Sequence, residues 1–322
     1  MRVLVTGAQG CIGAWVVKLL LERDIDVLVY DLEANPTRLS MIAPPEFVRK
    51  VVVKTGAIED TERVMSLVRD ESITHIVHLA ATLMPHCQQY PVQGGLVNVI
   101  GTLNVFEAAR KAGRRIRIVF ASSSAVWGPA GQYTDEPLSE KHSINPTTHY
   151  GIFKQANEGS ARVFYETDAI SSIALRPWTV YGVGRDHGLT AGPTIAAKAV
   201  ALQKPFQIRV SGFMDLQYVE DVADAFLRCL FSQLEGAHVF NLAGEIVSMQ
   251  DLIQILEGLR PGAAQLITAH GPQVPVAYKI DDSALLARVP GIRKTSVTEG
   301  LRKTLELYEK LAEEGRLPSN LE

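Results

Sequence analysis

Cysteine is scarce in this sequence, and no segment is apolar over enough residues to cross a membrane. The 322 residues include three cysteines, Cys11, Cys87 and Cys229, an odd number without metal-ligand spacing. Such sparse thiols are typical of a reducing compartment and argue against a disulfide-bonded secreted protein. A strand is expected almost directly after Met1, which leaves no room for a signal peptide. We therefore expect a cytoplasmic protein with no membrane partner and no bound metal.

An excess of charge of either sign is also missing. The 32 Lys and Arg residues are balanced by 35 Asp and Glu residues, for a net charge of −3. Nucleic-acid binding depends on a basic surface, so the composition gives no reason to expect such a partner. A hydrophobic content of 47% in a chain of this length allows a large buried core.

Glycine is plentiful, with 25 residues, and it marks the first motif. The apolar run at residues 2–6 is typical of a buried strand, and it leads into Gly7, Gly10 and Gly13 ahead of a helical apolar pattern. Glycines in such a turn let a pyrophosphate approach the backbone and the helix N-terminus. The spacing is GxxGxxG rather than the general GxGxxG, so an ordinary glycine-rich turn remains an alternative to a dinucleotide site.

Asp31 indicates which dinucleotide would bind. It ends a second apolar strand, eighteen residues beyond Gly13, where a carboxylate can bind the adenosine ribose hydroxyls. The same carboxylate repels a 2′-phosphate, so NAD is favoured over NADP. Arg38 lies close enough in the sequence to keep NADP an alternative.

Tyr150 and Lys154 form the most informative pair. Residues four apart share a helical face, and an ammonium beside a phenol favours the phenolate. The pKa of a model tyrosine is about 10, so a tyrosine that acts as a base at neutral pH needs its pKa lowered by roughly 3 units. One exposed lysine lowers the pKa by less than this. A second positive charge, such as an oxidised nicotinamide ring, would help. A hydroxyl from Ser122–Ser124, upstream, can share the proton.

In their order along the chain, these motifs resemble the extended short-chain dehydrogenase/reductase family, the NAD-dependent epimerase/dehydratase group. The resemblance covers nearly the whole length. It includes residues 6–13, 78–81, 98–102, 121–128, 150–154, 175–182 and 218–223.

The resemblance implies roles for individual residues. Ser123, Tyr150 and Lys154 would be catalytic, with Tyr150 moving a substrate proton and Lys154 holding the nicotinamide ribose. Asn98 resembles a residue that supports the active-site helix. The expected cofactor contacts are Gly7, Gly10, Cys11, Ile12, Gly13, Asp31, Ala57, Ile58, Leu79, Ala80, Ala81, Asn98, Ala121, Tyr150, Lys154 and Pro177. The expected substrate contacts are Thr82, Ser124, Thr179, Arg185 and His187.

Several positions depart from the family pattern. Thr179 replaces an asparagine and Met214 an arginine that often hold a nucleotide diphosphate, and Ala57 replaces an aspartate that often contacts adenine. Arg185 or Arg209 are possible substitutes for the missing cation.

We therefore expect an NAD-dependent oxidoreductase acting on a sugar, sugar acid or polyol. There are two alternatives, a nucleotide-sugar epimerase with tightly held NAD and a non-catalytic NAD-sensing protein. Dehydration is disfavoured because Ser124-Ala125 stands where dehydratases of this family have an acidic pair.

The alternation of patterns predicts an α/β fold, a Rossmann-type doubly wound parallel sheet with a smaller C-terminal substrate-binding lobe. Strands are expected near 2–6, 26–31, 51–54, 75–79, 116–121 and 172–176, and helices near 11–23, 60–70, 94–112 and 148–167. The NAD-binding domain would span 1–176, with 215–243 returning to it, and 177–322 would form mainly the substrate lobe. The resemblance also implies a homodimer formed by the helices near 94–112 and 148–167.

Overall fold

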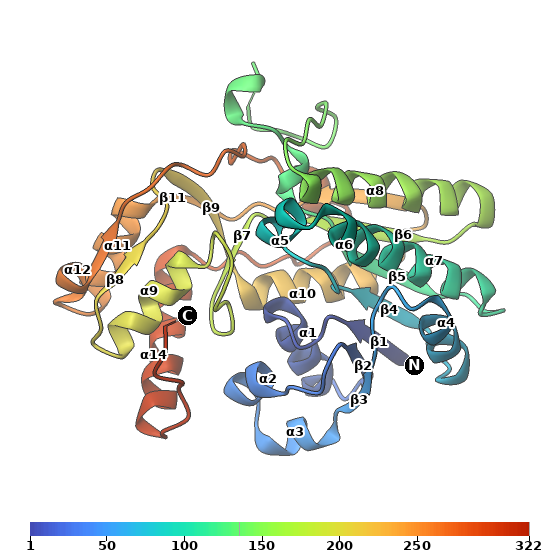
Figure 1. The fold of residues 1–322 in the computed structure, drawn as a ribbon, viewed down its shortest axis with the longest axis horizontal. Coiled ribbons are helices and arrows are strands. Elements are labelled where there is room, and N and C mark those ends of the chain that lie inside the picture. The colour runs from blue at the N-terminus through green and yellow to red at the C-terminus, as the bar shows by residue number, and fades with distance from the viewer. Residues whose placement is uncertain (135, 322) are drawn as a thin grey trace.

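A seven-stranded parallel sheet forms the centre of the molecule (Figure 1). The computed structural model describes residues 1–134 and 136–321. The strands are β1 (Arg2–Thr6), β2 (Asp26–Asp31), β3 (Val52–Thr55), β4 (His75–His78), β5 (Arg117–Ala121), β6 (Ser172–Arg176) and β10 (Ala237–Asn241), in the order β10-β6-β5-β4-β1-β2-β3. Every pair in this sheet is parallel, so the predicted Rossmann-type fold is confirmed.

Helices cover both faces of the sheet. Val3 and Val5 of β1 belong to one core cluster and Leu4 between them to the other, because successive side chains of a strand point to opposite faces. The first cluster includes residues of α1 (Cys11–Glu22) and α10 (Val219–Leu230). The second includes residues of α4 (Thr61–Asp70), α7 (Gly101–Lys111) and α8 (His149–Asp168). Burial on both faces explains why the strands are apolar runs rather than alternating patterns.

The C-terminal residues form a smaller lobe to one side of the main sheet (Figure 1, left). It contains a three-stranded sheet of β7 (Thr179–Tyr181), β9 (Phe213–Tyr218) and β11 (Glu245–Ser248), and the pair β8 (Phe206–Ile208) and β12 (Ile267–Ala269). Its helices are α9 (Gly192–Ala201), α11 (Met249–Leu259), α12 (Ala263–Leu266), α13 (Ser283–Arg288) and α14 (Val297–Glu313). Between these segments the chain returns to the main sheet, where α10 packs on α1 and β10 pairs with β6.

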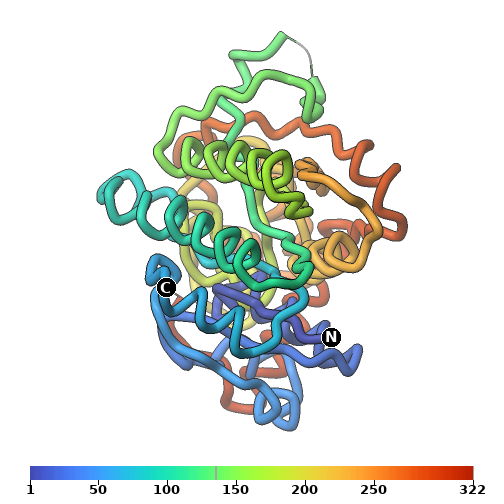
Figure 2. The backbone as a smooth tube through the Cα atoms, turned by 90° about the vertical axis from the view of Figure 1, so that its right-hand side faces the viewer, coloured from blue at the N-terminus to red at the C-terminus, as the bar shows by residue number. Residues whose placement is uncertain are grey.

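The helix expected near 94–112 is interrupted. It consists of α6 (Pro91–Gly95), a π-helical turn at Leu96–Ile100 and α7, and Figure 2 shows α7 running alongside α8. Short helices α2 (Thr37–Ile42), α3 (Pro45–Lys50) and α5 (Met84–Gln89) were not expected from the sequence. In the part of the chain that the structure describes, no helix has the length and apolarity of a membrane span.

Candidate active site

The glycine turn between β1 and α1 leaves no room for larger side chains. Gly7 has φ +66°, and a Cβ there would lie 2.5 Å from the backbone nitrogen of Ala80. A Cβ at Gly13 would lie 2.4 Å from the carbonyl oxygen of Gly7. Gly10 is the N-cap of α1 and provides no side-chain cap, so first-turn N–H groups stay available to a ligand. The turn therefore fits the pyrophosphate of a dinucleotide.

Asp31 and Arg38 border this turn with different partners. The Asp31 carboxylate accepts hydrogen bonds from the backbone nitrogens of Gln9 and Leu32, both at 2.8 Å. The Arg38 guanidinium donates to the carbonyl oxygens of Gln9 at 2.7 Å and Gly184 at 2.9 Å, and pairs with Asp186 at 2.7 Å. Because these partners occupy Arg38, it is not free to bind the 2′-phosphate of NADP.

A groove runs along the carboxyl ends of the strands as two connected hollows. One hollow is lined by residues around Asp31, including Gly56, Ile58, Glu59, Ala80 and Thr82. The other is lined by residues around Lys154, including Cys11, Ile12, Ala121, Ser123, Tyr150 and Pro177. Both hollows share Gly7, Gly10, Leu79 and Ala81. The residues present therefore fit an extended dinucleotide, with adenosine beside Asp31 and nicotinamide beside Tyr150.

Tyr150 and Lys154 lie in the first two turns of α8. Thr148 is the N-cap of this helix, and its hydroxyl accepts a hydrogen bond from the nitrogen of Gly151 at 3.1 Å. Lys154 is 4% exposed, and its Nζ donates to the carbonyl oxygen of Ala121 at 2.7 Å. The same Nζ lies 5.6 Å from the centre of the Tyr150 ring. The helix cap thus places the phenol and the ammonium on one face, directed towards the end of β5.

Burial determines the protonation of both groups. It raises the pKa of Tyr150, against the opposing effects of a hydrogen bond with Ser123 and the charge of Arg185. It lowers the pKa of Lys154 to about 8, although Cys87 and Glu158 raise it. The lower Tyr150 pKa that catalysis at neutral pH requires is therefore not produced by Ser123, Lys154 and Arg185 alone.

A cleft adjoins the nicotinamide end of the groove. Ser123, Tyr150 and Arg185 line both, so these side chains stand at the junction. The cleft has about 870 Å³ of empty space, part of it open to solvent. Its other lining residues include Leu83, Met84, Ser124, Trp127, Thr148, Trp178, Leu189, Thr190, Val274 and Val276. Among the described lining residues none is acidic, and Arg185 is the cation.

Other predicted substrate contacts lie in different places. Thr82 lines the adenosine side of the groove, and His187 is exposed at the nicotinamide side, where it pairs with Asp186 at 2.6 Å. Thr179 belongs to the cleft wall but has no exposed surface, and its hydroxyl donates to the sulfur of Met214 at 3.7 Å. Met214 is also fully buried. Neither position that replaces a diphosphate-binding residue offers a polar group to the cleft.

Two predicted cofactor contacts lie outside the described lining of the groove. Ala57 contributes its carbonyl oxygen to the Tyr30 hydroxyl at 2.9 Å. Asn98 is 1% exposed, and its side chain holds both the nitrogen and the carbonyl oxygen of Thr82 at 3.0 Å. In the π-helical turn, the Asn98 carbonyl oxygen accepts a hydrogen bond from Asn157 of α8 at 2.9 Å. Asn98 therefore joins the groove wall to the Tyr150 helix.

A buried ion pair that was not expected from the sequence involves the helix that carries Tyr150. Glu158 of α8 and Arg176 of β6 form it, and Ser122 also donates to the Glu158 carboxylate. A signal was present, because Glu158 lies four residues after Lys154 and so shares its helical face.

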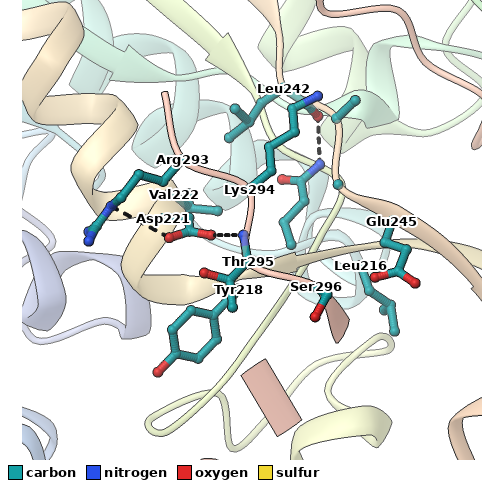
Figure 3. A pocket seen from close by; sticks show the side chains of 13 residues that line it. Leu216, Tyr218, Asp221, Val222, Leu242, Glu245, Arg293, Lys294, Thr295 and Ser296 are labelled. Carbon is teal, nitrogen blue, oxygen red and sulfur yellow. Dashed lines mark hydrogen bonds and ion pairs between the residues drawn. The ribbon is translucent and has the colours of Figure 1, made fainter. Parts of the chain in front are cut away.

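A second cleft lies where β9 and α10 meet residues 293–296 (Figure 3). The charged side chains of its described lining already have partners. The Asp221 carboxylate accepts a hydrogen bond from the nitrogen of Thr295 at 2.5 Å and faces Arg293, as the dashed lines show. Glu245 accepts from the nitrogen of Val297, the first residue of α14, at 2.7 Å. Asp221 and Glu245 thus already bind the backbone N–H groups to which an anionic ligand would otherwise bind. Across the described residues, no three metal-ligating side chains gather into a metal site.

Comparisons with known proteins agree with this architecture. The model of the NAD dependent epimerase/dehydratase family matches residues 3–243. A putative UDP-glucose 4-epimerase of Methanocaldococcus jannaschii is 30% identical over 260 residues, covering 79% of this chain and 81% of that protein. The UDP-glucose 4-epimerase of Mycolicibacterium smegmatis is 28% identical over 315 residues, covering 96% and 98%.

A solved structure extends the likeness to the whole fold. The Thermus thermophilus UDP-glucose 4-epimerase, crystallised in complex with NAD, superposes with a TM-score of 0.80 at 28% identity. The match covers 96% of this chain and 99% of that chain. The chain therefore belongs to the NAD-dependent epimerase/dehydratase family.

Proposed function

We propose that the protein is an NAD-dependent epimerase that inverts a secondary alcohol of a nucleotide sugar. The observation that carries the proposal is the position of Ser123 and Tyr150, which line both the dinucleotide groove and the adjoining cleft. A secondary alcohol held at this junction can lose a hydride from its carbon towards the groove while its hydroxyl proton passes to the Tyr150 phenolate.

The side chains supply proton transfer and orientation. Tyr150, as the phenolate, accepts the hydroxyl proton, with Ser123 sharing the hydrogen bond, and returns that proton to the carbonyl oxygen when a hydride is delivered to the opposite face of the carbon. Lys154 lies deeper in the groove, where its ammonium would bind the nicotinamide ribose. NAD, when bound, would supply the hydride acceptor and, once reduced, the hydride donor. Positive charge arriving with oxidised NAD favours ionisation of Tyr150, which compensates for the effect of burial on its pKa.

Two observations favour a nucleotide sugar over the smaller substrates expected from the sequence. Two relatives that match most of the chain are named as a putative UDP-glucose 4-epimerase and a UDP-glucose 4-epimerase. In addition, Arg185 supplies a cation to the cleft, and its Nη2 donates only to Thr190 at 3.2 Å, while its buried Nε has no partner among the described residues. A guanidinium without a carboxylate partner is suited to a phosphate.

A dehydrogenase acting on a free sugar, sugar acid or polyol is the second candidate. The burial of Thr179 and Met214 favours it, because the cleft lacks the polar groups that those positions provide in many nucleotide-sugar enzymes. A purely NAD-sensing role is less well supported, since a sensor has no need of a phenol and a hydroxyl at the junction of groove and cleft.

Product analysis separates the candidates. The protein is incubated with NAD and a panel of UDP- and dTDP-sugars, free sugars and sugar acids, and epimers are measured by NMR while NADH is followed by absorbance. We expect inversion of a nucleotide sugar without net NADH, and thermal stabilisation by UDP in the presence of NAD. NADH accumulation with a free sugar or sugar acid, without any shift by nucleotides, would show the dehydrogenase instead.

A further inference from the structure

The ion pair between Glu158 and Arg176 lies directly behind the proposed catalytic residues. Arg176 donates from Nε and Nη2 to the two carboxylate oxygens of Glu158, at 2.8 and 2.7 Å. The side chains are 5% and 8% exposed, so the pair is almost completely removed from water. The Arg176 guanidinium also stacks on the Trp127 ring, 4.8 Å from its centre.

Both partners are attached to the segments that carry the site. Glu158 accepts a hydrogen bond from Ser122, the residue before Ser123. The carbonyl oxygen of Arg176 accepts from the hydroxyl of Ser124 at 3.3 Å. The next residue, Pro177, lines the groove and accepts from the nitrogen of Ser124 at 3.0 Å. The pair thus connects α8 to the ends of β5 and β6 at the level of the proposed proton transfer.

Stability alone does not account for such a pair. Exchanging a buried ion pair for apolar side chains of similar volume is often neutral or stabilising, whereas removing one partner is costly. The bidentate geometry instead fixes the distance and direction between a helix and two strand ends. Lys154 lies one helical turn from Glu158, and Tyr150 lies two turns from it. A shift of α8 relative to the ends of β5 and β6 therefore displaces both side chains.

We propose that Glu158 is a positioning residue: held by Arg176 and Ser122, it fixes α8 against the ends of β5 and β6 and so sets Tyr150 and Lys154 opposite Ser123. The inference rests on the proposed roles of Tyr150 and Lys154.

The Glu158 carboxylate also acts on the charge of Lys154. Titratable groups around the ammonium are Tyr150 and Glu158 on its own helix, His78 at the end of β4 and Cys87 on α5. His78 is uncharged, since burial lowers its pKa to about 3. Removing the Glu158 charge lowers the pKa of Lys154 below about 8, so the ammonium loses its proton at a lower pH.

Binding of NADH tests the proposal without a sugar substrate. NADH fluorescence gives the dissociation constant at about pH 6 and about pH 8 for the wild type, Glu158→Gln and the double variant Glu158→Met/Arg176→Met, with thermal unfolding measured beside it. We expect Glu158→Gln to bind NADH roughly tenfold more weakly at about pH 8, with a smaller loss at about pH 6. The double variant is expected to regain the melting temperature and not the affinity.

Glu166→Gln is the matched control, because Glu166 lies on the same helix, is 56% exposed and pairs only with Arg162. Wild-type affinity of Glu158→Gln at both pH values would overturn the proposal. Recovery of both stability and NADH affinity in the double variant would also overturn it, because the pair would then serve stability alone. Because the experiment measures only NADH binding, its outcomes do not depend on which sugar is the substrate.

Discussion

Lys154 places its ammonium 5.6 Å from the centre of the Tyr150 ring and bonds to the carbonyl oxygen of Ala121 rather than to the phenol. The two side chains therefore interact through space and not by a direct hydrogen bond. In the proposed mechanism this arrangement separates proton transfer, by Tyr150, from cofactor orientation, by Lys154.

Tyr150→Phe is expected to reduce turnover of the sugar identified by product analysis by roughly 100-fold or more, because general acid–base catalysis contributes that much. NADH binding should change little, since Lys154 is retained. Tyr165→Phe, at an exposed tyrosine of the same helix, is the control and should behave like the wild type. An active Tyr150→Phe enzyme would exclude Tyr150 as the proton-transfer group.

Calorimetric titration should show NAD binding more tightly than NADP. Asp31 repels a 2′-phosphate, and Arg38 is held by Asp186 and two carbonyl oxygens. Asp31→Asn is expected to reduce the ratio of NAD affinity to NADP affinity by roughly tenfold without reversing it, because the described lining around Asp31 contains no cation. Asp26→Asn, at the other end of β2, serves as the control. Equal affinity of the wild type for both dinucleotides would contradict this account.

The expected homodimer can be tested on exposed apolar side chains of its two helices. Leu96, at the π-helical turn, is 45% exposed, and Val163 of α8 is 49% exposed. Light scattering should give a dimer for the wild type and a monomer for Leu96→Glu/Val163→Glu, because a charge is costly in a buried interface. Leu286→Glu on α13, where the leucine is 42% exposed, should remain dimeric. A monomeric wild type would rule out this interface.

Asp215 predicts a dependence of stability on pH. Burial raises its pKa to about 7, so the folded state holds the proton more strongly than the unfolded state. Its stabilising contribution is complete below pH ~4 and is lost as pH rises towards the folded value. Asp215→Asn should therefore be more stable relative to wild type at about pH 8 than at about pH 5. Urea unfolding measures this, with the exposed Asp168→Asn as control; an unchanged difference would contradict the assignment.

The sequence predicted β1 to β6 of the main sheet because most of these strands are short apolar runs, whereas β10, with the sequence AHVFN, was expected only as part of a segment that returns to the sheet. The short helices α2 and α3 follow Pro36 and Pro44 and have six residues each, too few to show a helical period in the sequence. The π-helical turn at Asn98 was also invisible, because its cause is tertiary: the Asn98 side chain binds Thr82 and its carbonyl oxygen binds Asn157.

Site residues that the local backbone conformation requires were easier to predict than residues whose role depends on contacts with distant parts of the chain. Gly7 and Gly13 have no space for a side chain, which makes the motif recognisable in the sequence. Thr179 looked like a substrate contact, but its burial behind the cleft surface depends on Met214, thirty-five residues away. Glu158 was missed because its partner Arg176 lies on a strand in a different motif.

The bridge made by Arg38 has a kinetic consequence. Its guanidinium ties Gln9 in the glycine turn to Gly184 and Asp186, in a segment that borders the nicotinamide end of the groove. We expect dissociation of the dinucleotide to wait until this bridge opens, which lengthens its residence time. An epimerase that keeps its NAD from one turnover to the next regenerates its own oxidant, and its rate then becomes independent of the free NAD/NADH ratio in the cell.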